Sequence, residues 1–470
     1  MKFLITCISA IALSLWLTAV KAQTDFNNGV DDVIANAHKM ANFTGTVLIA
    51  NSDGVIHQSV IGFADEAEKK VLTAEYRFAP GSIIKEFTTV ALMRLKAQGK
   101  ISYSDQITKY LDGFPSWAEE IKIEHLLTHT SGLGEMDYIT DMETAAVVEQ
   151  IKAVKKLKYS PGQGFSYGNF VTVLRALIIE KVTGTDYKSF IEKELFAASN
   201  MKNAFARDNI KTAAPLTAFG EKPLAIDGVT AYMTALDIYR WEKALWTNRL
   251  ISNEAFKSAL LTPSKGGRGR AYFDFGFYRT NKKGELTQVW HDGTYPKHYS
   301  LKFYDLEKDL FIILLSRDGR KATLRELSSY ISNLFSNTTL ATAEKKTLTL
   351  PFTWWLTEQL KSNAYDIVFT ELKRRFKSGD ITTTEAELTS SAYSLRRTNM
   401  DAAIELMKIT ADFFPTANAY DSYVDLLLKA ERYQKAKPVV KQGIILAKKE
   451  GNTFLLDRLV KFSKDIESNL

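Results

Sequence analysis

The sequence predicts an α+β chain, in which an antiparallel sheet flanked by helices carries a large helical insertion and is followed by an all-α helical repeat domain. Short strand-like segments cluster at residues 45–63 and again at 272–315, whereas the residues between them follow helical or loop patterns. Beyond residue 361 nearly every segment has helical periodicity. The length, 470 residues, exceeds that of one typical hydrophobic core, so two folding units are expected.

The N-terminus has the pattern of a secretory leader. A basic start at Lys2, a largely apolar run over residues 3–20 and the small residue Ala22 fit a signal peptidase site. We therefore expect residues 1–22 to be a signal peptide and the mature protein to be secreted, with the periplasm as its compartment. Lys21, beside the cut, leaves an uncleaved N-terminal anchor as the alternative. Later apolar runs are only as long as a strand, so no membrane span is expected after cleavage.

The single cysteine, Cys7, lies inside this leader, so the mature chain contains none. This excludes a disulfide framework, a thiol nucleophile and a cysteine-based zinc site. The formal net charge of +7 is mild for this length, and no block of basic residues interleaved with aromatics is present. Nucleic-acid binding is therefore not expected, and nothing in the sequence calls for a cofactor.

Two groups of strands are expected to form one sheet. The first group is a hairpin within Gly45 to Phe63, with Asp53-Gly54 as its turn. The second group covers residues 272–280, 286–290, 299–304 and 310–315. An antiparallel sheet built from both ends of a domain would bring the segments around Ser82, Tyr167 and His291 together.

We expect a first domain over residues 23–340, a connector over 341–360 and a helical domain over 361–470. In the last of these, Ala403 and Ala436 occupy equivalent places 33 residues apart. This spacing resembles that of tetratricopeptide repeats, in which small residues let two helices approach closely. A plain helical bundle is the alternative. A repeat of this kind would offer a binding surface to a protein partner.

Ser82-Ile83-Ile84-Lys85 stands at the start of a predicted helix that ends at Gly99. Lys85 lies one turn after Ser82 on the same face, where its amine can reach the hydroxyl. A neighbouring amine is one way to activate a serine without histidine. The spacing alone is a weak signal, since Ser199 and Lys202 repeat it with no apolar helix after them.

Two further motifs favour a catalytic site. Tyr167-Gly168-Asn169 joins a loop rich in proline and glycine to a predicted helix, and His291-Asp292-Gly293-Thr294 follows a predicted strand that ends at residue 290. Taken singly, Tyr167 reads as a turn aromatic, Asn169 as a helix N-cap and His291 as a strand-end residue. Gly293 would permit close approach of a substrate or backbone. The three motifs in this order are improbable as accidents.

Together these motifs resemble the serine β-lactamase and penicillin-binding-protein-like family, closest to its class C and esterase branch. The resemblance spans Thr44 to Asp318, and the segments 45–50 and 123–133 add to it. It implies that the acylated nucleophile, its proton partner and a general base or proton shuttle are, in that order, Ser82, Lys85 and Tyr167. It also implies that the substrate-binding residues are Asn169, His291, Gly293 and Thr294, with the backbone N–H groups of Ser82 and Thr294 as the oxyanion hole.

The resemblance implies a serine hydrolase that acts through an acyl-enzyme on a small-molecule or peptide substrate: an ester, an amide such as a D-amino-acid peptide, or a lactam. Two departures bear on this. Gly168 stands where serine is common, and the run 294–299 is bulky and charged where the family has small residues. Because this edge lines the family's substrate cleft, we expect an esterase or D-peptidase rather than an efficient β-lactamase. The alternative is a catalytically silent ligand sensor or scaffold whose helical domain binds a protein.

Two other patterns in the sequence resemble catalytic or metal-binding motifs. Gly164 to Gly168 matches the Gly-x-Ser-x-Gly elbow of α/β-hydrolases, with Ser166 as nucleophile, but no apolar strand directly precedes it. His125 and His129 are four residues apart, as in some zinc sites, but leucine follows His125 where the zinc-protease motif requires glutamate. We therefore expect no metal site.

Overall fold

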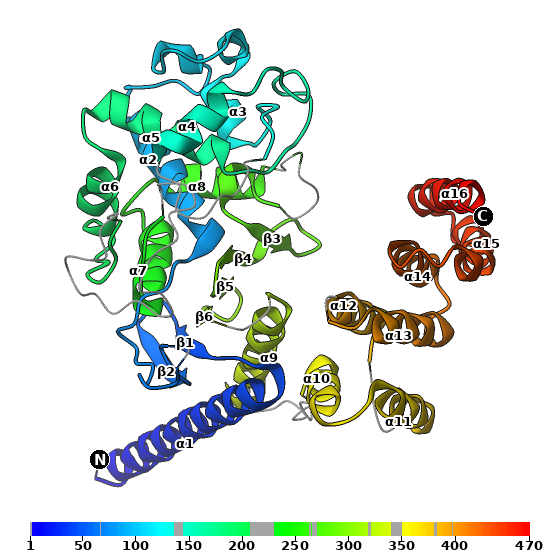
Figure 1. Cartoon of the computed structure of the whole chain (residues 1–470). Coiled ribbons are helices and arrows are strands. Elements are labelled where there is room, and N and C mark those ends of the chain that lie inside the picture. The colour runs from blue at the N-terminus through cyan, green and yellow to red at the C-terminus, as the bar shows by residue number, and fades with distance from the viewer. Residues whose placement is uncertain are drawn as a thin grey trace. The chain divides into compact units, whose positions relative to one another are not determined.

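The computed structural model describes residues 2–65, 67–135, 144–206, 230–262, 265, 270–317, 321–339, 350–379, 383–396 and 398–470. The chain divides into two compact units (Figure 1). The first consists of Met1–His38 and Asn42–Leu348, and the second of Lys39–Ala41 and Thr349–Leu470.

The first unit is built around a six-stranded antiparallel sheet of order β2-β1-β6-β5-β4-β3. Two of its inner strands, β1 and β6, are buried along their whole length and are largely apolar, because both faces of the sheet are covered. They pair although they come from opposite ends of the domain, as predicted. The strands are β1 (Gly45–Ala50), β2 (Val55–Ile61), β3 (Phe277–Thr280), β4 (Leu286–Tyr295), β5 (His298–Asp305) and β6 (Leu310–Ser316).

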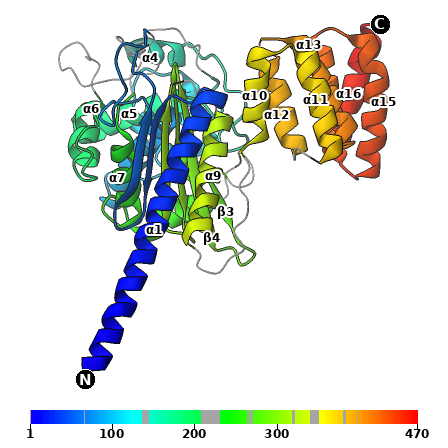
Figure 2. The same ribbon diagram turned by 90° about the horizontal axis from the view of Figure 1, so that it is seen from below.

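Helices cover the sheet on both faces (Figure 2). On one face lie α1 (Lys2–Ala41) and α9 (Lys321–Thr339). The other face carries the insertion between β2 and β3, whose α-helices are α2 (Lys85–Ala97), α3 (Ile123–Leu127), α4 (Thr144–Lys152), α5 (Phe170–Thr183), α6 (Tyr187–Phe190), α7 (Ala235–Trp246) and α8 (Asn253–Leu261). Short 3₁₀ turns are η1 (Gly81–Ile84), η2 (Ile107–Lys109), η3 (Ser116–Glu120) and η5 (Tyr272–Asp274), and a π-helical turn, η4 (Ile191–Phe196), follows α6.

The helix α2 is the centre of the insertion. Its residues are buried from Lys85 to Met93 on every side, so it is a core helix rather than an amphipathic surface helix. Gly99 follows with φ +70°, which confirms the predicted stop. Because α2 is enclosed, any polar side chain on it has to find a partner inside the protein.

At the N-terminus, α1 runs continuously past Ala22, so the expected cleavage site lies within this helix. Its second half packs on the core through Phe26, Val30 and Ile34. Among the helices as far as they are described, none combines the length and the apolar character needed to cross a membrane.

Two predicted strands differ from the observed ones. The segment expected as a strand from residue 272 forms η5 first, and β3 begins only at Phe277, because Phe273 and Asp274 adopt φ values of +60° and +65°. This bend turns the Asp274 carboxylate into the protein interior. The strand expected to end at Trp290 continues to Tyr295, since β5 pairs with it over its full length.

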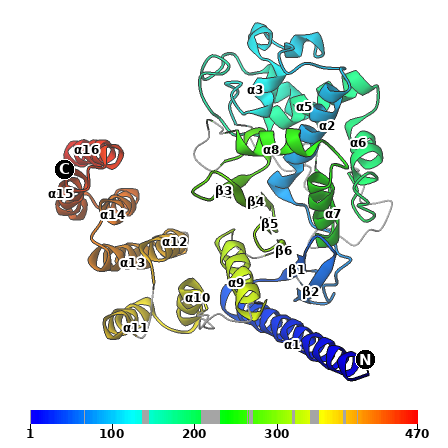
Figure 3. The ribbon, with the colours of Figure 1, turned by 180° about the vertical axis from the view of Figure 1, so that it is seen from behind.

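The second unit is a succession of helices in chain order, α10 (Phe352–Ser362), α11 (Tyr365–Ser378), α12 (Glu385–Leu395), α13 (Met400–Phe413), α14 (Ala417–Lys429), α15 (Tyr433–Lys449) and α16 (Thr453–Ser468) (Figure 3). Consecutive helices from α12 to α16 pack on one another, and Ala403 and Ala436 are buried between them. The tetratricopeptide resemblance stays a prediction. Much of the expected connector is helical, because α10 occupies it from Phe352, and its residues 341–349 lie outside the described part of the chain.

Candidate active site

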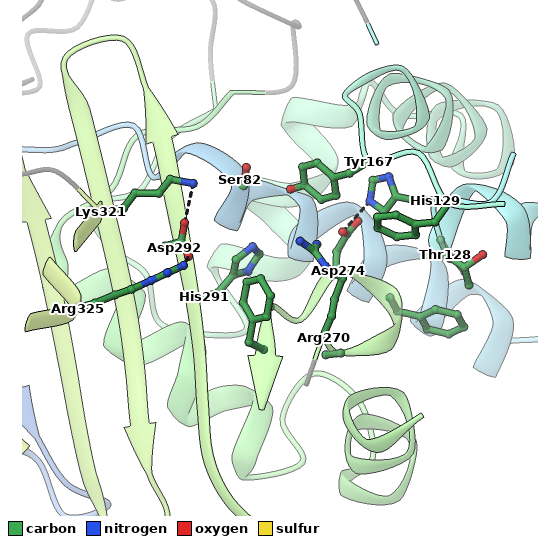
Figure 4. Close-up of a pocket in the computed structure, with 16 residues that line it drawn as sticks. Ser82, Thr128, His129, Tyr167, Arg270, Asp274, His291, Asp292, Lys321 and Arg325 are labelled. Carbon is green, nitrogen blue, oxygen red and sulfur yellow. Dashed lines mark hydrogen bonds and ion pairs between the residues drawn. The ribbon is translucent and has the colours of Figure 1, made fainter. Parts of the chain in front are cut away.

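A cavity of about 260 Å³ opens at the meeting point of η1, β4 and the loop before α5. Ser82, Tyr167 and His291 all line it, so the structure brings together one residue of each predicted motif (Figure 4). In this view the hydroxyl of Tyr167 is directed toward Ser82. The other lining residues are Leu127, Thr128, His129, Phe165, Arg270, Ala271, Phe273, Asp274, Gly276, Phe277, Asp292, Lys321 and Arg325.

Lys85 is the first residue of α2 and does not line this cavity. Its side chain is buried, and its Nζ lies 4.9 Å from the centroid of the Tyr167 ring. An ammonium over an aromatic face is attracted to the ring, which fixes the relative position of amine and phenol. The amine of Lys85 is therefore held against the ring of Tyr167, whose hydroxyl is directed toward Ser82.

The other face of Tyr167 is supported by His129. The two ring centroids are 4.5 Å apart, and the backbone N–H of Gly168 donates to Nδ1 of His129 at 3.4 Å. Nε2 of His129 lies 2.7 Å from Oδ1 of Asp274. Since Nδ1 accepts a hydrogen bond, Nε2 carries the proton in the neutral ring, and burial lowers the pKa of His129, which favours this neutral form. His129 thus positions the Tyr167 loop.

The carboxylate of Asp274 is a fully enclosed anion. Arg175 of α5, which is completely buried, donates to its Oδ2 at 2.7 Å and to the Thr89 hydroxyl at 2.8 Å. Burial alone would raise the pKa of Asp274, but His129 and Arg175 outweigh it and hold this pKa far below its usual range. The Arg175–Asp274 pair therefore ties α2, α5 and η5 together behind the cavity.

A second buried cluster lies behind His291. Its Nδ1 is 2.6 Å from Oε1 of Glu86, whose other oxygen accepts from Lys302 at 2.7 Å and from the Trp241 indole at 2.9 Å. Lys302 is also paired with Glu242. The cluster joins α2, α7, β4 and β5, so the third motif is anchored to the helix that starts at the first motif.

Backbone contact between η1 and β4 depends on two glycines. A Cβ at Gly293 would lie 1.8 Å from the Pro80 carbonyl oxygen, and a Cβ at Gly81, where φ is +57°, would lie 2.4 Å from the Thr294 nitrogen. The Ser300 hydroxyl donates to the same Pro80 oxygen at 2.6 Å. Gly293 and Thr294 therefore lie directly against the turn that carries Ser82, although neither lines the cavity itself.

The charged lining of the cavity is mainly cationic. Asp292 is held by Lys321 at 2.6 Å and by Arg325 at 2.5 Å, and these two cations outweigh burial and keep the pKa of Asp292 low. Arg270 lies among three aromatic rings. Its Cζ is 5.5 Å from the centroid of the Phe165 ring, 5.2 Å from the centroid of the Tyr167 ring and 4.8 Å from the centroid of the Phe277 ring. Its buried Nε has no hydrogen-bond partner, and no carboxylate of the described residues pairs with it.

The run after the third motif does not crowd the cavity, contrary to expectation. Tyr295 and His298 are both buried and lie outside the cavity lining, with Tyr295 packed against Ala79 and Tyr232. His298 accepts a hydrogen bond from the backbone N–H of Ala79 at 3.2 Å. Other residues of this run differ, since Thr294, Pro296 and Lys297 are exposed.

Asn169 occupies the N-cap position of α5 but does not cap it with its side chain, and it does not line the cavity. The competing nucleophiles Ser166 and Ser199 also lie outside the lining. No strand lies directly before Ser166, and the sheet pairs only antiparallel strands in the described residues, so the α/β-hydrolase alternative fails. Nδ1 of His125 accepts from the Lys122 backbone rather than facing a common centre with His129.

Sequence reasoning missed the charges that support the site. Glu86, Arg175 and Lys302 each stand inside an apolar helix or strand, and each is buried and paired. Burying a charged residue on the core face of a helix or strand costs free energy unless the charge is paired. A charge among apolar neighbours in the sequence could therefore have indicated these buried pairs. Arg270 could not be found in this way, because its segment has no regular apolar pattern.

Comparisons with known proteins identify the family of the chain. The family model described as Beta-lactamase matches residues 30–355. Penicillin-binding protein 4* of Bacillus subtilis (strain 168) is 27% identical over 311 residues, which cover 58% of this chain and 68% of that protein. D-amino acid amidase from Ochrobactrum anthropi SV3 has a TM-score of 0.56 at 19% identity, covering 67% of this chain and 100% of its own. A class C beta-lactamase has a TM-score of 0.55 at 17% identity, and the match covers 68% of this chain and 98% of that chain.

The matched region contains the sheet, the helical insertion and the cavity. It makes up more than half of the chain, and its fold is that of the β-lactamase and penicillin-binding-protein serine hydrolases. The chain therefore belongs to the β-lactamase family.

Proposed function

We propose that this protein is a serine hydrolase that forms an acyl-enzyme at Ser82 with an ester, an amide of the D-amino-acid type or a lactam. The observation that carries the proposal is the common cavity of Ser82, Tyr167 and His291, with the Lys85 amine against the Tyr167 ring. A hydroxyl with a basic nitrogen and a phenol beside it is the arrangement that activates a serine nucleophile.

In the proposed reaction, Ser82 Oγ bonds to the carbonyl carbon of the substrate while its proton passes to the pair formed by Lys85 and Tyr167. This pair then protonates the leaving alcohol or amine as its bond to carbon breaks. Water attacks the resulting ester and releases the acid. Backbone N–H groups of Ser82 and Thr294 serve as the oxyanion hole, which is supported by the contact between η1 and β4.

The charge of the cavity favours a substrate that carries an anionic group. Lys321 and Arg325 share one carboxylate, and Arg270 pairs with none among the described residues, so the lining has surplus positive charge. The similarity to D-amino acid amidase supports amides of D-amino acids as candidates. Tyr295 and His298 of the run after His291 are buried, whereas Lys297 is exposed, and none of the three lines the cavity.

Mapping a covalent adduct tests the proposal. A fluorophosphonate and a penicillin are incubated with the protein, and the labelled peptide is identified by mass spectrometry. Label on Ser82, abolished in Ser82→Ala and retained in Ser166→Ala, is the expected result. Label elsewhere, or no Ser82-dependent hydrolysis of p-nitrophenyl esters, D-Ala-D-Ala peptides or nitrocefin, would favour the alternative of a ligand sensor.

We also propose that the protein is exported through its N-terminal leader and that its helical unit binds a protein partner. N-terminal sequencing of the protein from the periplasmic fraction of its host is expected to begin after Ala22. A start at Met1, or recovery from the cytoplasm alone, would contradict export.

A further inference from the structure

Glu86 is the one acidic side chain in the first turn of α2, and it is completely buried. It directly follows Lys85 in the chain but points to the sheet, where β4 and β5 supply its partners. Lys302 also has a second buried carboxylate partner, Glu242. Burying a second carboxylate beside the same lysine has a large desolvation cost. We therefore expect a role of Glu86 other than its ion pair with Lys302.

The hydrogen bonds of Glu86 divide cleanly between its two oxygens. Oε2 accepts from the ammonium of Lys302 and the indole N–H of Trp241, which are both groups that only donate. Oε1 is left for Nδ1 of His291, at 2.6 Å. The Glu86 carboxylate is ionised, because Lys302 and His291 outweigh the effect of burial and lower its pKa.

An ionised carboxylate only accepts hydrogen bonds, so Nδ1 of His291 has to carry a hydrogen. In the neutral imidazole this leaves a lone pair on Nε2. His291 lines the cavity with Ser82 and Tyr167, and Nε2 has no hydrogen-bond partner among the described residues. Nε2 of His291 is therefore a free proton acceptor on a residue that lines the cavity.

We propose that Glu86 is a positioning residue that holds His291 as the Nδ1–H tautomer, and that Nε2 of His291 accepts the proton of the water that releases the acyl group from Ser82. This rests on the proposed acyl-enzyme. The water oxygen bonds to the acyl carbon while its proton moves to Nε2. The bond between that carbon and Ser82 Oγ then breaks, and the proton passes from Nε2 to Oγ.

The tautomer is measured without any assay of activity. Protein with ¹⁵N-labelled histidine is examined by long-range ¹H–¹⁵N correlation at the pH of maximal activity, and His291→Gln identifies the His291 signals among the six histidines. A protonated Nδ1 with an unprotonated Nε2 is expected. A protonated Nε2, either alone or together with Nδ1, would overturn the proposal.

Glu86→Gln provides the test by substitution. Because Lys302 and Trp241 only donate, the amide oxygen of the new side chain has to face them, and its NH₂ group then faces Nδ1 of His291. The imidazole is expected to switch to the Nε2–H tautomer. Deacylation and kcat should fall about 10²-fold, the lower range for loss of a general base, while the rate of Ser82 labelling and kcat/KM, which report acylation, change little.

Glu242→Gln is the matched control. Glu242 is as buried as Glu86 and pairs with the same lysine, but it has no contact with His291. It is expected to lose as much stability as Glu86→Gln while keeping the wild-type tautomer and kcat. Equal losses of kcat in the two variants, or an unchanged tautomer in Glu86→Gln, would refute the positioning role. Absence of any Ser82 adduct in the wild type would instead refute the proposed function.

Discussion

Replacing Gly293 by alanine tests whether the contact between β4 and η1 sets the geometry of the site. The new Cβ would lie 1.8 Å from the Pro80 oxygen, whereas ordinary contact begins at 3.4 Å, so the two backbones have to separate by about 1.6 Å. Pro80 lies two residues before Ser82, and Gly293 directly precedes Thr294. A displacement of about 1 Å between reacting groups can lower a rate about 10²-fold, so kcat/KM should fall at least about 10²-fold. Overpacking of this kind destabilises by about 1–3 kcal/mol.

The assay is the rate at which a fluorophosphonate labels Ser82, together with kcat/KM for the best ester substrate. Thermal unfolding and circular dichroism establish that the variant is folded. Gly54→Ala is the control, since a Cβ there meets no atom within 4 Å and its backbone lies outside the left-handed region. If Gly293→Ala labels at the wild-type rate, the contact does not shape the oxyanion hole and the reasoning is refuted.

Three further outcomes follow from single side chains. Burial raises the pKa of Asp421, the partner of Arg458, from 3.8 to about 6, so stability that is present below 3.8 is lost as the pH rises through 6. Asp421→Asn should therefore stabilise the helical unit at pH 7 in calorimetry, and no gain, or an equal gain in Asp425→Asn, would contradict this. Burial lowers the pKa of His298 from 6.5 to about 4, so stability that is present above pH 6.5 is lost as the pH falls through 4. In urea unfolding, the free energy of unfolding of His298→Asn should depend less on pH than that of the wild type. An identical pH dependence in the two proteins would refute the assignment. Arg270→Met should lower kcat/KM about 10- to 100-fold for an ester bearing a carboxylate but hardly for a neutral one, and equal losses for both would remove its role in recognition.

Most of the sheet was predictable because two of its inner strands are self-evident in the sequence. Gly45–Ala50 and Leu310–Ser316 are largely apolar runs of the right length, and burial on both faces demands such a pattern. The errors arose where distant contacts override local preference. The strand was expected to end at Trp290, yet pairing with β5 keeps Asp292 and Gly293 in it.

The site was predictable as far as its motifs are local. Ser82 and Lys85 are related by one helical turn, and Tyr167 and His291 each stand in a recognisable segment. The supporting charges are different, because their partners are remote: Glu86 lies 205 residues from His291 in the sequence. Spacing cannot pair residues over such separations. Only the presence of a charge on a core face indicates that a partner exists.

The helix α2 connects these local and remote features. Its N-terminus follows Ser82, and its next turns carry Glu86, bound to the sheet, and Thr89, which accepts from Arg175 of α5. Both sides of the cavity are thus fixed to one buried helix through charged hydrogen bonds. Removing one partner of a buried pair costs about 3–5 kcal/mol, because the other charge is left uncompensated. Loss of stability is therefore the expected companion of misplacement at this site. The histidine tautomer and the ratio of Ser82 acylation to deacylation are the measurements that separate the two effects.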